Sequence, residues 1–388
     1  MFTIQVEKTI QLIKQIFYLM GIWQRDEESN YRKMGKKLFY SFLGTFYPIF
    51  FTANAFLCDN LVEAVFSVQI SITATIGYVK ILYVLFEKHE ILAFLRDPIV
   101  VHSIENREEY EETVKKIKKF MNFVRLYCLA IFATAPVLIV IALPIFSSDR
   151  GLPLFISFSW NHSEIIYWFA YLFVSLSCFL YVIMNLMTIL IWYIMLNYSI
   201  EYELLGNKLR KLGVIKKTVS KTTKKQKQFK LTQRSGFAED LIVFVKAHRN
   251  LTETIKRFRS FFSTLFLVQI TTSGIIICTS VYSLAFSSNQ NIVQIEFYVV
   301  VVLYAIFDIF LIMYLANDIT VASDRLSYCL FKSNWIEQTQ LCKKYVVIMC
   351  EVLKQPQQLV VLMYPMNLET FMTIVNGAYS MFNLLKSL

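Results

Sequence analysis

The 388-residue sequence has little charge, glycine or proline: 17% of its residues are charged, and it contains ten Gly and seven Pro. Soluble proteins carry roughly a quarter charged residues. With 56% hydrophobic residues and a mean hydropathy of +0.49, the chain has too few polar side chains to cover a soluble surface. These values exclude a soluble globular enzyme, and the same composition excludes a collagen-like or disordered chain.

Catalytic and metal-binding motifs are also absent from the sequence. Its seven cysteines are scattered singly without a CxxC pair, so neither a disulfide scaffold nor a zinc site is predicted. No GxSxG, HExxH, P-loop or GxGxxG motif occurs, and the four histidines have no paired carboxylates. We therefore expect no enzymatic activity, no metal and no cofactor.

Long apolar runs are what the sequence has instead. A helix needs about 20 apolar residues to cross a hydrocarbon layer of ~30 Å. Seven runs reach that length and predict an all-α polytopic membrane protein with seven transmembrane helices. The fourth run is free of charge over 36 residues, so its helix should project beyond the bilayer. The runs are 38–58, 64–86, 126–148, 165–200, 260–295 with a turn-like end at 287–291, 297–317 and 359–388.

Positive charge is distributed unevenly among the connections between these runs. The net charge is +11, with 39 Lys and Arg against 28 Asp and Glu. Segments 1–38, 87–125, 201–259 and 320–358 hold 36 of the 39 cations, whereas the alternate connections hold only Arg150. The positive-inside rule therefore predicts a cytoplasmic N-terminus and an extracellular C-terminus, opposite to a G-protein-coupled receptor. A glycosylation sequon at Asn161 falls in an outside loop, and the sequence leaves its use open.

Four parts of the chain follow from these runs and charges. Residues 1–36 form a cytoplasmic amphipathic helix and linker, and we expect that helix to lie in the membrane interface. Residues 37–319 hold six transmembrane helices and a basic cytoplasmic loop at 201–259. Ten Lys or Arg and no acid between 208 and 230 indicate a flexible loop touching anionic lipid, and no nucleic-acid partner. Residues 320–358 form a cytoplasmic region, and 359–388 form the seventh helix.

Two ionisable residues lie within the first six runs, where charge is costly. Lys80 is close to the cytoplasmic end of its run, so we expect its side chain to reach the interface. Asp308 is deeper, and we expect it to hydrogen-bond a neighbouring helix rather than bind an ion.

Polar residues recur in the last run at intervals of 4, 3, 4, 3 and 4, which aligns them on one face of a helix. Such a face either joins helices within one chain or forms the wet wall of a pore shared by several chains, and periodicity favours neither. Two leucines beside it, Leu384 and Leu388, could form apolar rings around an axis. The polar residues are Glu369, Thr373, Asn376, Ser380, Asn383 and Ser387.

Several motifs of the chain resemble the insect odorant receptors. The match is carried by Trp335, by Lys354-Gln355-Pro356, by Thr370-Phe371 and by Tyr379-Ser380 with Leu384-Leu385, with weaker support from residues 20–23. The resemblance covers about 55 residues by motif and the whole chain by topology. Two residues depart from the family pattern: Ala378 stands where the family often has Thr, and Asn383 is more polar than the usual neighbour.

The resemblance implies a ligand-gated, non-selective cation channel in the plasma membrane of an olfactory sensory neuron dendrite. In that family, odorant-tuned subunits assemble with the co-receptor Orco as heterotetramers, and each seventh helix lines the pore. Orco has a longer second cytoplasmic loop, so this chain is interpreted as a tuning subunit that binds a small volatile organic odorant. The expected partners are thus Orco, the odorant, permeating cations and membrane lipid.

Site residues implied by the resemblance fall into three groups. The gate is expected at Leu384 and Leu388, with Ser387, Ser380 and Asn383 on the pore wall. The assembly surface is expected from Trp335 to Pro356. The odorant pocket of the family lies in the outer half of the bundle, and helix amphipathicity selects Phe66, Gln69, Ile70, Thr73, Pro136, Ile139, Val140, Tyr167, Tyr171, Val174, Cys178, Thr272, Ile276, Thr279 and Tyr282. The opposite face of the fourth helix, Phe169, Phe173, Leu176 and Leu180, is expected to face lipid.

Two alternatives remain open. A gustatory-type receptor of the same superfamily would conduct as a homomer. A seven-helix receptor that signals through a soluble partner would use the basic loop as its coupling surface and would place the N-terminus outside.

Overall fold

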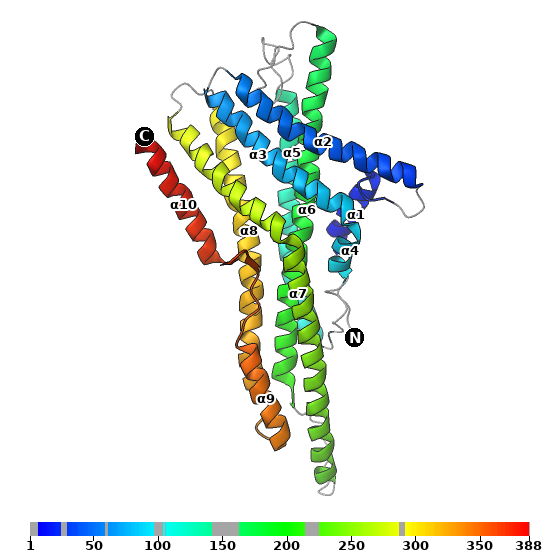
Figure 1. The fold of residues 1–388 in the computed structure, drawn as a ribbon. Helices are drawn as coiled ribbons and strands as arrows, with labels where there is room; N and C mark the ends of the chain where they lie inside the picture. Colours follow the sequence, from blue (N-terminus) through cyan, green and yellow to red (C-terminus); the bar gives the residue numbers. More distant parts are fainter. Residues whose placement is uncertain are drawn as a thin grey trace.

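The computed structural model describes residues 7–24, 29–58, 61–96, 104, 106–141, 163–213, 225–286 and 292–387. These residues form ten α-helices and one two-stranded antiparallel hairpin, which confirms the all-α prediction (Figure 1). The sequon at Asn161 and the residue Leu388 lie outside the described residues. The elements are α1 Lys8–Leu19, α2 Asn30–Leu57, α3 Leu61–Phe86, α4 Lys88–Arg96, α5 Arg107–Ile141, α6 Glu164–Lys211, α7 Lys225–Phe286, α8 Ile292–Phe331, α9 Gln340–Leu353, β1 Val360–Val361, β2 Tyr364–Pro365 and α10 Leu368–Ser387.

Four of these helices contain segments long and apolar enough to cross a membrane: Glu63–Phe86, Glu164–Lys211, Gly236–Ala285 and Tyr298–Phe331. The other three predicted spans fall in α2, α5 and α10. The 48 residues of α6 extend over roughly 72 Å at 1.5 Å per residue. This length exceeds the bilayer, as predicted, and Figure 1 shows α6, α7 and α8 continuing together to the end of the molecule at which α9 lies.

The core of the bundle is built around α6. Every residue from Asn185 to Tyr202 is buried, including the large side chains of Trp192 and Tyr198. An α-helix that is apolar on all sides requires neighbours on all sides, and α6 packs against α5, α7 and α8. Outside the apolar core, Lys116 links α5 to α6 through a 2.7 Å hydrogen bond to Glu203. Burial alone would lower the pKa of Lys116, but that bond and the charge of Asp318 raise it.

The predicted basic loop at 201–259 is largely helical, which corrects the sequence interpretation. Helix α6 continues to Lys211 and α7 begins at Lys225, while residues 214–224 lie outside the described residues. The reason is an apolar repeat at intervals of 3, 4 and 7 that the charge count concealed. These residues are buried in the bundle, and the Phe258 ring lies 5.4 Å from that of Tyr198 on α6. The repeat consists of Phe237, Leu241, Phe244, Leu251, Ile255 and Phe258.

The position of α1 also differs from the prediction. Its apolar residues Ile10, Ile13 and Phe17 are at most 1% exposed, because they pack into the hydrophobic core rather than into lipid. Trp23, which follows the helix, is fixed by a buried 3.0 Å hydrogen bond from its indole N–H to the carbonyl of Val84. The amphipathic pattern was correctly identified, but the protein itself supplies the apolar partner.

The C-terminal part of the chain consists of α9, the hairpin and α10. Thr339 caps α9 by accepting a hydrogen bond from the backbone N–H of Cys342. The seventh helix begins at Leu368 rather than at the expected residue 359, because β1 and β2 occupy the intervening residues. Asn367 accepts a 2.8 Å hydrogen bond from the N–H of Thr370, and this bond fixes the start of α10. Figure 1 shows α10 at one edge of the bundle, where it packs against α7 and α8.

Candidate functional site

The outward face of α10 carries the polar residues identified in the sequence. The opposite face packs inward: Ala378 is 7% exposed, and the Phe371 ring lies 5.5 Å from Phe310 of α8. Thr373 and Ser380 donate to carbonyl groups of α10 itself. Among the residues that the structure describes, the stripe therefore does not join helices within this chain. Its exposed members are Glu369, Thr373, Asn376, Ser380 and Asn383.

The expected gate lies at the far end of the same helix. Leu384 is 62% exposed and lies next in sequence to Asn383 of the exposed stripe. Ser387 belongs to the last turn of α10, but its side chain and Leu388 fall outside the described part of the chain. Of the two residues expected to form the gate, Leu384 is therefore the one whose side chain the structure describes.

One group of predicted pocket residues links α3 to α7 and α8. The amide nitrogen of Gln69 donates a 2.7 Å hydrogen bond to the hydroxyl of Thr279. Phe66 packs edge-on against Tyr298, with ring centroids 6.0 Å apart. Gln69 and Phe66 are buried, and so is Ile276 on α7. The half-buried members of this group are Ile70, Thr73, Thr272, Thr279 and Tyr282.

A second group links α5 to α6. The hydroxyl of Tyr171 donates a hydrogen bond to the carbonyl of Ile139, and Cys178 packs in a small cluster that Ile139 also touches. Tyr167 and Val174 are buried on the same face of α6. The remaining two predicted residues, Pro136 and Val140, are exposed on α5 among the described residues.

Charged and polar side chains meet inside the bundle, and the structure corrects the prediction for Lys80. Its side chain is 4% exposed and donates a 2.8 Å hydrogen bond to Thr188 of α6, so it does not reach the interface. Asp308 is fully buried and accepts a hydrogen bond from Gln269 of α7, as expected. No hydrogen bond or ion pair joins these two described residues directly, and their opposite charges attract each other across the bundle. This Lys80–Asp308 network ties α3, α6, α7 and α8 together.

Comparison with known proteins decides the family. A family profile described as 7tm Odorant receptor matches residues 60–379. The chain belongs to the odorant receptor family. Seven transmembrane helices are the topology of this family, and the odorant receptor is not an enzyme.

Individual relatives cover almost all of this odorant receptor chain. It is 28% identical to Odorant receptor 94a of Drosophila melanogaster over 97% of both chains, and 22% identical to Odorant receptor 46a, isoform B, over 95% of this chain and 96% of the relative. Its fold is similar to the olfactory receptor OR5 of Machilis hrabei in complex with eugenol. The TM-score is 0.79 with 14% identity, and the match covers 98% of each chain. A second structure of OR5 gives a TM-score of 0.77.

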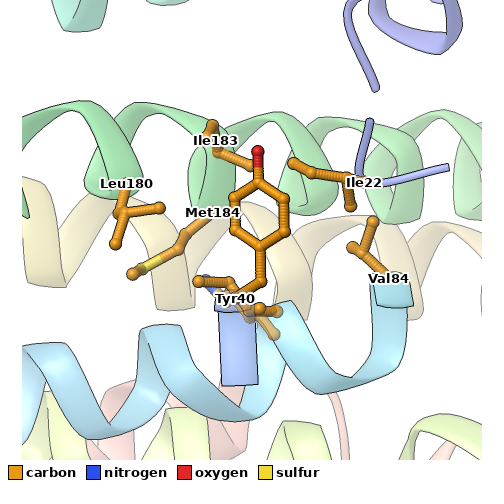
Figure 2. Close-up of a pocket in the computed structure, with 8 residues that line it drawn as sticks. Ile22, Tyr40, Val84, Leu180, Ile183 and Met184 are labelled. Carbon is orange, nitrogen blue, oxygen red and sulfur yellow. The ribbon is translucent and has the colours of Figure 1, made fainter. Parts of the chain in front are cut away.

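A cavity of this odorant receptor lies where the sequence did not predict one. It is small, with room for about one water molecule, and Figure 2 shows residues that line it. None of the predicted pocket residues lines it. In the sequence, the one indication of this cavity is Lys80, a lysine inside an apolar run. The lining residues come from the segment after α1 and from α2, α3 and α6: Ile22, Tyr40, Lys80, Ile81, Val84, Leu180, Ile183 and Met184.

The cavity also corrects the lipid-facing assignment on α6. Leu180 is 3% exposed, and Phe173 is half-buried because its ring stacks 4.7 Å from Tyr47 of α2. Of the four residues expected to face lipid, Phe169 is the one that stays largely exposed, at 73%. Helix amphipathicity alone does not predict that α2 covers this face of α6 near Phe173 and Leu180.

The expected assembly residues of the odorant receptor flank α9. Trp335 is half-buried and donates a 3.1 Å hydrogen bond to the carbonyl of Phe331 at the end of α8, while Pro356 follows α9. One face of α9 is buried in the chain, through Val346 and Leu353. The other face is apolar and exposed, through Leu341, Tyr345, Ile348 and Val352.

Proposed function

We propose that the chain is the odorant-binding subunit of an odorant-gated, non-selective cation channel. The observation that carries this proposal is the exposed polar face of α10. Hydrocarbon cannot satisfy polar side chains of a membrane helix, so that face requires water or another chain against it. A water-filled pore surrounded by several α10 helices supplies both.

The gate of this channel is formed by Leu384 and Leu388. Ser380, Asn383 and Ser387 form the polar wall of the pore beside it. Odorant binding stabilises a bundle conformation in which α10 moves outward and Leu384 turns away from the axis, so that the constriction becomes wet. The 62% exposure of Leu384 in the single chain is consistent with this position.

Leu384→Ala should alter gating, because a smaller side chain widens the apolar constriction and lowers the cost of wetting it. We expect a higher basal current under voltage clamp. Leu172 of α6 is 68% exposed and supplies a matched control, since Leu172→Ala removes the same atoms away from the pore. Unchanged basal and evoked currents in Leu384→Ala would show that the gate assignment is wrong.

The odorant is proposed to bind in the outer half of the bundle, between α3, α5, α6 and α7. The two groups described above supply buried rings together with a few hydroxyl and amide groups, as a small volatile ligand requires. OR5 of Machilis hrabei, whose fold is similar, forms a complex with eugenol, a small aromatic molecule. A ligand of comparable size and polarity is proposed for this chain.

Tyr171→Ala and Thr279→Ala should shift odorant potency by about 3- to 10-fold, the effect of losing one hydrogen bond. Currents driven by a co-receptor agonist should be unchanged. The conservative Tyr171→Phe and Thr279→Ser variants separate the hydroxyl from the side-chain volume. An equal loss of odorant and agonist currents would indicate misfolding instead of a pocket effect.

The proposed assembly is a heterotetramer with the co-receptor Orco in the plasma membrane of an olfactory sensory neuron dendrite. The exposed apolar face of α9, between Trp335 and Pro356, is the proposed contact, because adjacent exposed apolar side chains are typical of protein-binding surfaces. The distribution of Lys and Arg supports a cytoplasmic N-terminus, which places α9 inside the cell and the end of α10 outside.

Co-expression with and without Orco under voltage clamp, with a panel of odorants, tests the function as a whole. Odorant currents that require Orco support the tuning-subunit proposal, whereas currents from the chain alone would favour a gustatory-type homomer. A tag at Met1 that antibodies reach on intact cells would favour a receptor acting through a soluble partner.

A further inference from the structure

One charged residue of the exposed polar face remains without a role in this scheme. Glu369 lies in the first turn of α10 and is exposed on the same face as Thr373 and Asn376. It is the single acidic residue of α10. No ion pair involving Glu369 occurs among the described residues, whereas Lys354, the nearest cation before it in sequence, is paired with Glu351.

The surroundings of Glu369 hold its backbone in place. Met366 donates a 2.7 Å hydrogen bond to the carbonyl of Leu359, which closes the hairpin, and Thr370 donates a 2.7 Å bond to the carbonyl of Pro365. Leu359 and Met366 are at most 2% exposed. The carboxylate therefore projects from a fixed point at the start of the helix.

We propose that Glu369 is a conductance- and selectivity-determining residue that concentrates cations at the cytoplasmic mouth of the pore. The inference rests on the proposed function, in which α10 lines the pore. A fixed negative charge raises the local concentration of cations, and rings of carboxylates in this position select cations in channels. Fifteen residues separate Glu369 from Leu384, or roughly 22 Å of helix, so the charge acts apart from the gate.

A second explanation for an acid at this place is stabilisation of α10 through the helix dipole. The two explanations differ in their dependence on salt. A dipole contribution would affect expression and folding but leave the current–voltage relation of a folded channel unchanged. A charge at the mouth acts on ions in solution, so its effect fades as the screening length falls from about 8 Å at 0.15 M to about 3 Å at 1 M.

The test uses the chain co-expressed with Orco and recorded in inside-out patches with K⁺ as the permeating ion. Glu369→Gln should lower outward relative to inward current by about 1.5- to 2-fold at 0.15 M KCl, with the difference lost at 1 M. Glu369→Lys should have a larger effect, and Glu369→Asp should behave as the unaltered chain. Asp324→Asn, which removes an exposed acid from α8, should leave the current ratio unchanged.

An unaltered current ratio in Glu369→Gln, or a change that persists at 1 M KCl, would overturn the proposal. A further measurement uses the unaltered channel and needs no variant. When the K⁺ concentration is lowered, its outward conductance should fall by a smaller factor than the concentration does. Failure here is distinct from failure of the pore assignment. If Leu384→Ala changes gating while Glu369→Gln has no effect, α10 lines the pore and the role of Glu369 alone is wrong.

Discussion

Helices α8 and α10 both carry polar residues within apolar sequence, but the two sets of residues have different environments. Asp308 of α8 is fully buried and accepts a hydrogen bond from Gln269, within reach of the charge of Lys80. The polar residues of α10 face outward, and the hydroxyls of Thr373 and Ser380 bond only to their own helix. The fold thus engages the buried side chains of Lys80 and Asp308 in hydrogen bonds between helices and leaves the polar residues of α10 for water or another subunit.

The difference between the two helices has a physical basis in the free energy lost when a polar or charged side chain loses its partner. Removing one partner of a buried ion pair leaves an uncompensated charge and costs about 3–5 kcal/mol, whereas replacing both partners can be nearly neutral. An exposed polar side chain has no such internal partner to lose. Substitutions in the Lys80–Asp308 network should therefore affect folding, and substitutions on the α10 face should affect function.

The largest expected effect is at Asp308. Asp308→Asn keeps an acceptor for Gln269 but removes the opposite charge that acts on the Lys80 ammonium. Because no direct ion pair joins these two described residues, we expect about 3 kcal/mol of destabilisation, the low end of the range for a broken buried ion pair. Lys80→Met leaves the carboxylate alone and should cost a similar amount. The double variant should be more stable than either single variant. Thermal unfolding of the purified chain in detergent measures all three, and additive losses in the double variant would show that the two charges do not interact.

A second comparison uses glycines of the two regions. A Cβ at Gly77 of α3 would lie 1.7 Å from the sulfur of Met184, whereas a Cβ at Gly377 of α10 would meet nothing within 4 Å. Gly77→Ala should cost about 1–3 kcal/mol through overpacking. Gly377→Ala should stabilise the chain by up to about 1 kcal/mol, because alanine favours helix.

The same unfolding assay distinguishes these outcomes, and Met184→Ala should rescue Gly77→Ala since it removes the clashing atoms. Equal stability of the two alanine variants would show that α3 and α6 do not approach closely at Gly77. If Gly377→Ala leaves the single chain stable but abolishes the assembled channel, a neighbouring subunit packs against α10 at that residue.

Sequence reasoning succeeded where a single helix carries the signal. The polar stripe from Glu369 to Ser387 was visible from spacing alone, and the apolar runs located the spans. The seventh helix was placed nine residues too early because a two-residue hairpin turn has no strong signature when Leu362, at φ +54°, occupies a position that usually favours glycine.

Sequence reasoning failed where the outcome depends on a neighbouring helix. Lys80 lies close to the end of its run, which predicts that its side chain reaches the interface. Thr188 of α6, 108 residues further along the chain, accepts its hydrogen bond inside the bundle instead. Likewise the cavity is assembled from four separate segments of the chain. The helical extension of α7 is a different case, since its apolar repeat was present in the sequence and was obscured by counting charge.

The smallest expected effect on stability, and the sharpest contrast with Asp308, is on the exposed face of α10. Asn376→Leu removes a polar group that faces outward, so thermal stability of the single chain should stay within about 0.5 kcal/mol of the original. The odorant-evoked current should nevertheless fall, because an apolar side chain at mid-pore favours drying. Met372→Leu, at a residue that is 53% exposed, tests whether any change on α10 has this effect. A stable Asn376→Leu chain with normal current would mean that the exposed face of α10 meets protein rather than permeating ions.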